Sequence, residues 1–345
     1  MKYAMKFRTS ISALFFILAS LPMATTAEAI IPAPPQLAAE AWMLVDGKTG
    51  EVLVEHNSEQ RLPPASLTKI MTSYVAAAEL KRGTISMNDM VNISVKAWRM
   101  EGSRMFIQEG TQVRFEDLLR GVIIQSGNDA SVALAEHIAG GEDAFAGMMN
   151  QQAARLGMAN TNFVNATGLP HENHYTTPAD LVKLTRSLIR DYPDHYDMYA
   201  EKYFTYNDIR QPNRNSLLWR DPSVDGVKTG HTEAAGYCLI AAAERDGMRL
   251  VSVVMGADSE EARAMESQKL LTYGFRYFDT LELYAAGESL RDVRVWGGTD
   301  ESLGSGWRCL RSSRSREARR NNSRHHWISR AFSKHRSSKA RRSES

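Results

Sequence analysis

The sequence is poor in cysteine and in long apolar runs. Only Cys238 and Cys309 occur among its 345 residues, and they lie far apart in unlike stretches of sequence. A framework of disulfide bonds is therefore not expected. Beyond the N-terminal segment, no apolar run approaches the roughly 20 residues that a membrane-spanning helix needs. The rest of the sequence therefore predicts no membrane span.

Motifs that bind metals or phosphate groups are also missing. The 9 histidines show no metal-ligand spacing, and the pattern His-x-x-x-His is absent. The stretch SVDGVKTG, residues 223–230, lacks the glycine spacing of a phosphate-binding loop. We therefore expect no metal and no cofactor.

Charge is unevenly distributed, although the composition is ordinary, with 43% hydrophobic and 24% charged residues. Residues 305–345 hold 13 of the 42 Lys+Arg and 2 of the 40 Asp+Glu, a net charge of 13 − 2 = +11. The remaining 29 and 38 give residues 1–304 a net charge of −9. The basic character therefore belongs to the C-terminal segment and not to the body of the protein.

Residues 1–29 have the pattern of a secretory signal peptide. A basic start with Lys2, Lys6 and Arg8 precedes the apolar run ISALFFILASLPM, and Ala27-Glu28-Ala29 fits the small-residue cleavage rule. An uncleaved anchor is the alternative interpretation. We expect secretion across the inner membrane to the periplasm or cell envelope, with the mature chain beginning near Ile30.

The body of the sequence predicts a helical middle bracketed by strands. Apolar and turn patterns predict strands at 41–46, 51–56, 203–210, 224–230, 236–244 and 249–257, and helices at 65–83, 115–125, 129–140, 144–158, 177–193 and 261–278. Such an order indicates one α+β domain, residues 37 to about 278, whose sheet joins both ends of the segment.

The stretch LPPASLTKIM, residues 62–71, places Ser66 three residues before Lys69 in a run that is otherwise apolar. Residues i and i+3 share a helix face. A serine hydroxyl needs a base within hydrogen-bond reach to become a good nucleophile. If the shared face is buried, desolvation lowers the lysine pKa and makes the amine a usable base near neutral pH. By itself, Ser-x-x-Lys is equally typical of a surface lysine beside an incidental serine.

Two further stretches make the pattern specific. SGN, residues 126–128, lies between two predicted helices, and KTG, residues 228–230, lies on a predicted edge strand. In this order the three motifs resemble the signature of the penicillin-recognising serine enzymes. The surrounding stretches, among them RGVIIQSGNDASVALAE and VDGVKTGHTEAAGYCLIAAA, are similar to the secreted D-alanyl-D-alanine carboxypeptidases, the low-molecular-mass penicillin-binding proteins. The resemblance covers residues 37 to 304.

The resemblance implies the serine β-lactamase/transpeptidase fold, an α+β fold with a helical cluster packed on an antiparallel sheet. It also implies a second, β-rich domain after the catalytic one. We expect a signal peptide at 1–29, the catalytic domain at 30–278, and the start of a truncated β domain at 279–304. Peptidoglycan stem peptides ending in D-Ala-D-Ala would be the substrate, and β-lactam antibiotics would be covalent inhibitors.

For the reaction, the resemblance implies that Ser66 attacks the carbonyl between the two terminal D-alanines while Lys69 takes its proton. The released D-alanine leaves an acyl-enzyme, which water then hydrolyses. Ser126 and Lys228 would relay a proton to the leaving amine, although Ser126 is also compatible with a solvent-capping hydroxyl. The backbone N–H groups of Ser66 and His231 would form an oxyanion hole, in which one donor is worth about 3 kcal/mol.

Substrate binding is assigned by the same resemblance. Asn128 would bond the substrate amide, and it could also cap the helix that follows it. Lys228 and Thr229 would contact the anionic end of the substrate, and Gly230 would let its backbone lie along the strand. The remaining substrate-binding candidates are His231, Arg214 and Arg263; the two arginines are equally compatible with surface cations.

Two other activities use the same scaffold. A class A β-lactamase carries Ser-Asp-Asn and a glutamate that activates the deacylating water. Here Gly127 replaces the aspartate and no Glu-x-x-Leu-Asn stretch occurs, so we expect a penicilloyl ester to persist. A D,D-endopeptidase that cuts crosslinks would use the same residues and stays open.

Residues 305–345 stop resembling the family. Of these 41 residues 11 are Ser and 11 are Arg, a composition that buries too little apolar surface to offset backbone ordering. We predict disorder there and interpret the change as a shifted reading frame near residue 305, which resequencing would test. Nucleic acid is not an expected partner of a secreted enzyme. Apolar residues at helical spacing within HHWISRAFSKHR leave membrane association undecided, because the usual C-terminal anchor of the family is not recognisable.

Overall fold

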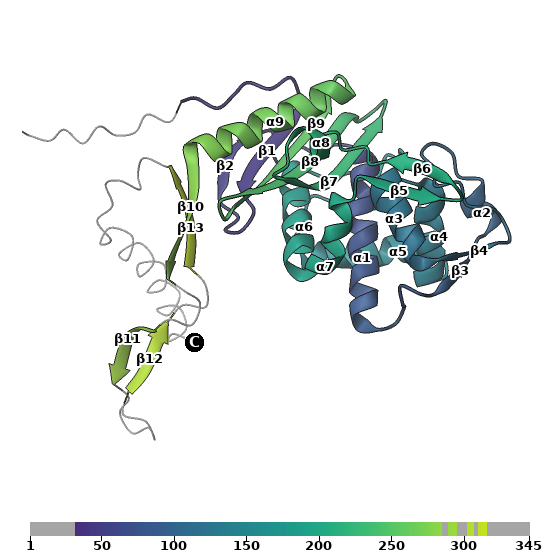
Figure 1. Ribbon diagram of the computed structural model, residues 1–345, viewed down its shortest axis with the longest axis horizontal. Coiled ribbons are helices and arrows are strands. Elements are labelled where there is room, and N and C mark those ends of the chain that lie inside the picture. The colour runs from purple at the N-terminus through teal and green to yellow at the C-terminus, as the bar shows by residue number, and fades with distance from the viewer. Residues whose placement is uncertain (1–31, 285–288, 295–301, 307–309, 316–345) are drawn as a thin grey trace, which may run out of the picture. The chain divides into compact units, whose positions relative to one another are not determined.

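The computed structural model describes residues 32–284, 289–294, 302–306 and 310–315, which are coloured in Figure 1. The predicted signal peptide at 1–29 and the apolar residues of the HHWISRAFSKHR stretch lie outside these ranges. Among the described residues, no helix combines the length and apolarity that a membrane crossing requires.

A five-stranded antiparallel sheet joins the two ends of the catalytic segment, as predicted. Its strand order is β2-β1-β9-β8-β7, with every neighbouring pair antiparallel. The strands are β1 (Ala41–Asp46), β2 (Val52–His56), β7 (Val224–Thr232), β8 (Gly236–Arg245) and β9 (Met248–Ala257). Strand β7, which carries the Lys-Thr-Gly motif, is an edge strand and leaves one side of its backbone unpaired within this sheet.

The sheet separates two apolar cores because alternate residues of a strand face opposite sides. Met43, Val45 and Val251 pack in the core on the side of the helical cluster. Leu44 and Leu250 pack on the other side with Leu270 and Leu271 of α9 (Glu260–Tyr277), which covers that face (Figure 1).

The helical cluster surrounds helix α1 (Lys69–Arg82), which is buried along most of its length. Its other main helices are α3 (Phe115–Arg120), α4 (Asn128–Ala139), α5 (Glu142–Arg155) and α6 (Pro178–Asp191). Helix α6 begins where Thr177 accepts a hydrogen bond from the Asp180 amide and Pro178 occupies the first turn, a favourable start for a helix. Gly83 ends α1 in the left-handed conformation, as the sequence predicted.

Short elements complete the catalytic body. They are η1 (Ala65–Thr68), β3 (Met90–Asn92), α2 (Val95–Trp98), β4 (Gln112–Arg114), the π-helical turn η2 (Gly121–Gln125), α7 (Pro193–Tyr196), η3 (Asp197–Ala200), β5 (Tyr203–Tyr206), β6 (Ile209–Pro212) and α8 (Leu217–Arg220). The predicted helix at 115–125 is thus α3 followed by η2, and the predicted strand at 203–210 is a hairpin of two strands.

The C-terminal residues that the structure describes form two further strand pairs. Strand β10 (Phe278–Tyr284) pairs with β13 (Leu310–Ser315), and β11 (Ser289–Arg294) pairs with β12 (Ser302–Gly306). Strand β13 and the end of β12 lie inside the segment 305–345 for which the sequence predicts disorder. Backbone pairing with β10 and β11 gives these short stretches regular structure despite their polar composition. Residues 316–345 lie outside the described ranges.

Candidate active site

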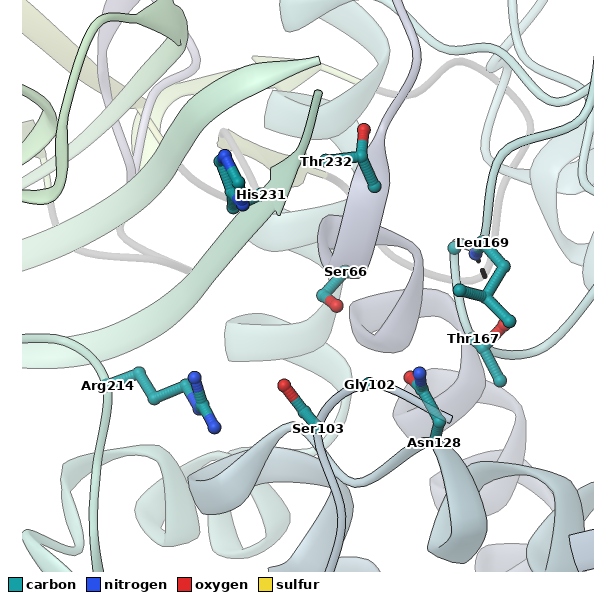
Figure 2. A pocket seen from close by; sticks show the side chains of 10 residues that line it. Ser66, Gly102, Ser103, Asn128, Thr167, Leu169, Arg214, His231 and Thr232 are labelled. Atoms are coloured by element: carbon teal, nitrogen blue, oxygen red, sulfur yellow. Dashed lines mark hydrogen bonds between the residues drawn. The ribbon is translucent and has the colours of Figure 1, made fainter. Parts of the chain in front are cut away.

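A pocket of about 390 Å³ opens where the helical cluster meets strand β7. Figure 2 shows Ser66 near its middle, with Arg214 on one side and Thr167 and Leu169 on the opposite side. Its lining residues are Ser66, Gly102, Ser103, Asn128, Thr167, Gly168, Leu169, Arg214, His231 and Thr232. The three sequence motifs therefore meet at a single pocket. Ser66 comes from the first motif, Asn128 from the second, and His231 directly follows the third.

Ser66 lies in the 3-10 turn η1, which continues into α1 at Lys69. Side chains three residues apart are eclipsed in a 3-10 turn. The Lys69 Nζ consequently reaches the Ser66 Oγ at 3.1 Å. This geometry confirms the predicted approach of the hydroxyl and the amine, through a tighter turn than the α-helix that the sequence indicated.

Lys69 is buried, with 1% of its surface exposed, and has two further partners besides Ser66. Its Nζ lies 2.8 Å from the Asn128 Oδ1 and 2.6 Å from the Thr167 carbonyl oxygen. The Asn128 Nδ2 donates to the Glu101 carbonyl oxygen at 2.6 Å. Because that carbonyl can only accept, it fixes the orientation of the carboxamide and turns Oδ1 toward Lys69.

Burial lowers the pKa of Lys69 to about 7, with a further lowering by the positive charge of Arg214 and an opposing effect of Asp129. A neutral amine has two N–H donors and one lone pair. Two of the three neighbours of Nζ, Thr167 O and Asn128 Oδ1, are acceptors and engage the two N–H groups. The lone pair then points toward the third neighbour, the Ser66 hydroxyl, which can donate its proton.

The segment Asn165–Leu169 clamps the nucleophile turn and was not singled out by the sequence. A Cβ on Gly168 would lie 1.8 Å from the Ala65 carbonyl oxygen, and Gly168 has a φ of +85°. Ala65 itself adopts a φ of 47°, which a non-glycine residue rarely does. Asn165 Oδ1 accepts from the amides of Thr167 and Gly168 and holds the segment in this shape. The only local sequence signal is an Asn-x-x-Gly turn, which is common.

Asn128 does not cap the following helix, in contrast to the alternative considered from the sequence. Helix α4 begins at Asn128 itself, and Gly127 is the capping residue without a side-chain hydrogen bond. The next residue, Asp129, accepts from the amides of Met105, Phe106 and Ile107. Asp129 thereby fixes the loop that supplies Gly102 and Ser103 to the pocket, a role that no pattern in the sequence predicts.

Ser126 is buried and lies in the left-handed conformation, with a φ of 65°. Its Oγ has no hydrogen-bond partner among the described residues. An unpaired buried hydroxyl is costly. Ser126 itself is not among the residues that line the pocket, but it belongs to the same Ser-Gly-Asn motif as Asn128, which is. The resemblance implies that Ser126 and Lys228 relay a proton, but no hydrogen bond joins the two side chains in this structure.

Lys228 and Thr229 are buried on strand β7, with 2% and 4% of their surfaces exposed. The Lys228 Nζ donates to the Thr229 carbonyl oxygen at 3.1 Å. Burial, reinforced by the charges of Lys69, Arg214 and Arg263, lowers the pKa of Lys228 well below its ordinary value. A Cβ on Gly230 would lie 3.2 Å from the Pro64 carbonyl oxygen, so a glycine lets β7 approach the nucleophile turn closely.

The two candidate arginines have different environments. Arg214 lines the pocket and is held by a hydrogen bond from its Nε to the Gln125 carbonyl oxygen at 3.0 Å. Arg263 does not line the pocket: it is 4% exposed, and its Nη1 donates to the Gly230 carbonyl oxygen at 3.3 Å. His231 lines the pocket, is exposed, and stacks on Tyr237 with ring centroids 4.0 Å apart.

No group of histidine, cysteine, aspartate and glutamate side chains that could hold a metal ion occurs among the residues that the structure describes. The pocket instead combines the Ser66 hydroxyl and the Arg214 guanidinium in its lining, with the buried amines of Lys69 and Lys228 on the elements that form it. Such an arrangement suits nucleophilic attack on a carbonyl compound that carries a negative charge.

Comparison with known proteins shows that the chain is similar to peptidases. Residues 28–259 match the family of D-alanyl-D-alanine carboxypeptidases. The chain is 46% identical over 304 residues to D-alanyl-D-alanine carboxypeptidase DacC of Escherichia coli (strain K12), which covers 86% of this chain and 75% of that protein.

Solved structures agree with the sequence comparisons. Penicillin-binding protein 5 from Haemophilus influenzae matches with a TM-score of 0.80 and 44% identity, over 83% of this chain and 85% of the other. Penicillin-binding protein D2 from Listeria monocytogenes, solved in its ampicillin-bound form, matches with a TM-score of 0.66 and 30% identity, over 71% of this chain and 100% of the other. These matches confirm the predicted fold class.

Proposed function

The chain belongs to the family of D-alanyl-D-alanine carboxypeptidases, serine peptidases, and we propose that Ser66 is the nucleophile with which it removes the terminal D-alanine from peptidoglycan stem peptides. The observation that carries this proposal is the position of the Lys69 Nζ, which lies 3.1 Å from the Ser66 Oγ and within reach of two acceptor oxygens. When the amine is neutral, Asn128 and Thr167 engage its two N–H groups, and its lone pair is left for the Ser66 hydroxyl.

Acylation begins when Lys69 accepts the hydroxyl proton as Ser66 attacks the carbonyl of the penultimate D-alanine. A C–O bond forms, and collapse of the tetrahedral intermediate breaks the C–N bond. The proton that Lys69 accepted is relayed by way of Ser126 and Lys228 to the leaving nitrogen, which departs as D-alanine and leaves Lys69 neutral again. Water then hydrolyses the acyl-enzyme. The orphan Ser126 Oγ supports this role, because a bound substrate would supply its missing partner.

The anionic end of the substrate is bound on the cationic side of the pocket. Arg214 provides positive charge there. The buried Lys228 and Thr229 of strand β7 would add an amine, whose charged form an arriving anion favours, and a hydroxyl. The backbone N–H groups of Ser66 and His231 stabilise the oxyanion, since both residues line the pocket. Arg263 supports strand β7 through the Gly230 carbonyl and acts on the substrate only indirectly.

In the cell this reaction trims pentapeptide stems and limits crosslinking. Its relatives are bacterial cell-wall enzymes, and we propose the periplasm or cell envelope as the location of this protein. β-Lactam antibiotics resemble the D-Ala-D-Ala end and are proposed to acylate the same serine. A persistent penicilloyl ester is expected, since the chain lacks the Glu-x-x-Leu-Asn stretch of class A β-lactamases.

The test is the intact mass of the purified mature chain after incubation with benzylpenicillin, beside Ser66→Ala. We expect an adduct of one drug mass that persists and is absent from the variant. Release of D-alanine from a soluble peptide ending in D-Ala-D-Ala should depend on Ser66 in the same way.

Three other results would indicate a different activity or contradict the proposed role of Ser66. Rapid loss of the drug with unmodified protein would indicate a β-lactamase. Release from crosslinked fragments without release from pentapeptides would indicate an endopeptidase. No adduct and no drug loss, in a sample that circular dichroism shows to be folded, would overturn the role of Ser66.

A further inference from the structure

Three side chains form an exposed cluster that the proposed reaction does not use: Tyr203, Arg210 and Trp219, hereafter the aromatic patch. Tyr203 and Trp219 are 43% and 42% exposed. Their ring centroids lie 5.7 Å apart at an interplanar angle of 76°, and the Arg210 guanidinium carbon lies 3.7 Å from the Tyr203 centroid. Single exposed apolar residues are ordinary, but two aromatic rings in contact under a stacked cation indicate a binding surface.

The β5–β6 hairpin builds this patch. Residues directly opposite each other in an antiparallel pair share a face. Tyr203 pairs with Pro212, and Thr205 pairs with Arg210, so these four residues share the outer face. Phe204 and Gln211, the pair between them, are both buried on the inner face.

The inner face of the hairpin is fixed to the wall of the active-site pocket. The Gln211 Nε2 donates to the Arg104 carbonyl oxygen at 3.2 Å, directly after Ser103 of the pocket lining. The Asn213 amide donates to the Lys202 carbonyl oxygen at 2.8 Å. The next residue along the chain, Arg214, enters the pocket. The hairpin that carries the aromatic patch is therefore joined through Asn213 to Arg214, which lies on one side of the pocket in Figure 2.

The donors of Arg210 are not used within the described protein, where no ion pair or hydrogen bond engages them. Arg220, which follows Trp219 in the sequence, differs because it pairs with Glu261 at 2.6 Å. A guanidinium that lies on a ring keeps its N–H groups free at the rim. Aromatic faces are electron-rich and attract the C–H faces of pyranose rings, while rim N–H groups suit hydroxyl and N-acetyl carbonyl oxygens. The patch has both elements of a saccharide site.

We propose that the aromatic patch binds a glycan strand of polymeric peptidoglycan and holds it beside the catalytic pocket. This inference rests on the proposed function, since stem peptides are attached to glycan strands. A membrane surface is the less suitable occupant. Anionic membranes attract clusters of about four to eight Lys and Arg. The patch contains Arg210, and its sequence neighbours add Lys202 and Arg220, of which Arg220 is paired with Glu261.

Binding is tested without catalysis, in the Ser66→Ala background. Purified protein is sedimented with insoluble peptidoglycan sacculi, and the bound fraction gives an affinity. Adding Tyr203→Ala and Trp219→Ala is expected to weaken binding about tenfold, the loss that truncation of two anchoring aromatics produces. The control adds Met90→Ala and Met265→Ala, which remove side chains that are 50% and 45% exposed elsewhere on the surface, and should leave binding unchanged. The milder variants Tyr203→Thr and Trp219→Gln replace the double variant if its melting temperature falls.

Activity provides the second readout, with Ser66 intact. The patch variants should release D-alanine from a soluble, sugar-free peptide at the normal rate and from sacculi more slowly. Equal sacculus binding by patch and control variants would overturn the inference. So would an equal loss on the sugar-free peptide, or a loss of binding to phosphatidylglycerol vesicles with sacculus binding intact. A failure of the proposed function would appear separately, as wild-type protein without penicillin adduct.

Discussion

The pocket lies between the helical cluster and strand β7, here called the helical wall and the sheet wall. Each wall contains a buried lysine, and the two lysines have different hydrogen-bond partners. On the helical wall, the Lys69 Nζ lies within 3.1 Å of three oxygens, from Ser66, Asn128 and Thr167. On the sheet wall, the Lys228 Nζ donates to the carbonyl oxygen of its own neighbour, Thr229. Both amines are buried, so burial by itself does not distinguish them.

The neighbours of each amine decide what it can do. Burial is the first cause of the lowered pKa at both lysines. At Lys69 the positive charge of Arg214 lowers it further and Asp129 opposes, whereas at Lys228 three cations act in the same direction. Three directional partners make Lys69 a base with a defined lone pair. The guanidinium groups of Arg214 and Arg263, which stay charged when Lys69 is neutral, make the region of Lys228 a site for an anion, whose arrival favours the charged amine.

The largest effect is expected from removing the base on the helical wall. Lys69→Met keeps a chain of similar length but has no lone pair on nitrogen to receive the Ser66 proton. The rate of acylation by benzylpenicillin, followed by intact mass, should fall by about 10²- to 10⁴-fold, the usual contribution of a general base. Lys81→Met, on the exposed part of the same helix, is the matched control. Acylation of Lys69→Met at the rate of the control would remove Lys69 from the mechanism.

A second prediction tests the clamp that positions the nucleophile turn. Gly168→Ala places a Cβ against the Ala65 carbonyl oxygen in a residue with a φ of +85°. Gly140→Ala is the matched control, because Gly140 has a φ of +76° but open space around its Cβ position. We expect the control to lower the free energy of unfolding by about 1 kcal/mol with normal acylation.

Gly168→Ala should cost more than the control in urea unfolding. The folded protein should also acylate about a hundredfold more slowly, since a displacement of the order of an ångström at the reacting atoms has that effect. If the two alanine variants acylate equally fast, the contact between Gly168 and Ala65 does not position Ser66.

The pH dependence of acylation tests whether Arg214 lowers the pKa of Lys69. The reactive form of Lys69 is neutral, so the acylation rate should rise about tenfold per pH unit below a pH of about 7 and level off above it. Arg214 lowers the Lys69 pKa, and Arg214→Gln should therefore move the midpoint to higher pH. Arg155→Gln, an exposed arginine on α5, should leave it unchanged. A midpoint that moves downward in Arg214→Gln would contradict the electrostatic coupling.

Many of the proposed functional residues could be predicted because they lie in three short sequence motifs. The pattern of apolar residues gave the sheet that joins both ends of the domain, and the spacing of Ser66 and Lys69 gave their contact. The clamp at Gly168 and the loop fixed by Asp129 were not predictable. Their partners are backbone groups of distant residues, and a backbone carbonyl or amide leaves no mark in the side-chain sequence. The distinction between Arg214 and Arg263 likewise depends on tertiary packing.

The smallest effect on catalysis is expected from substituting Arg263, in contrast to Arg214. Its guanidinium contacts the Gly230 carbonyl behind the strand, while Arg214 lines the pocket. Arg214→Gln should raise the KM for a D-Ala-D-Ala peptide about tenfold or more, the loss expected when a charged hydrogen-bond partner is removed. Arg263→Gln should raise it less than about threefold and mainly lower the melting temperature, because it removes a buried hydrogen bond. Equal effects of the two variants on KM would mean that Arg263 reaches the bound substrate, as the sequence suggested, and that strand β7 moves when the substrate binds.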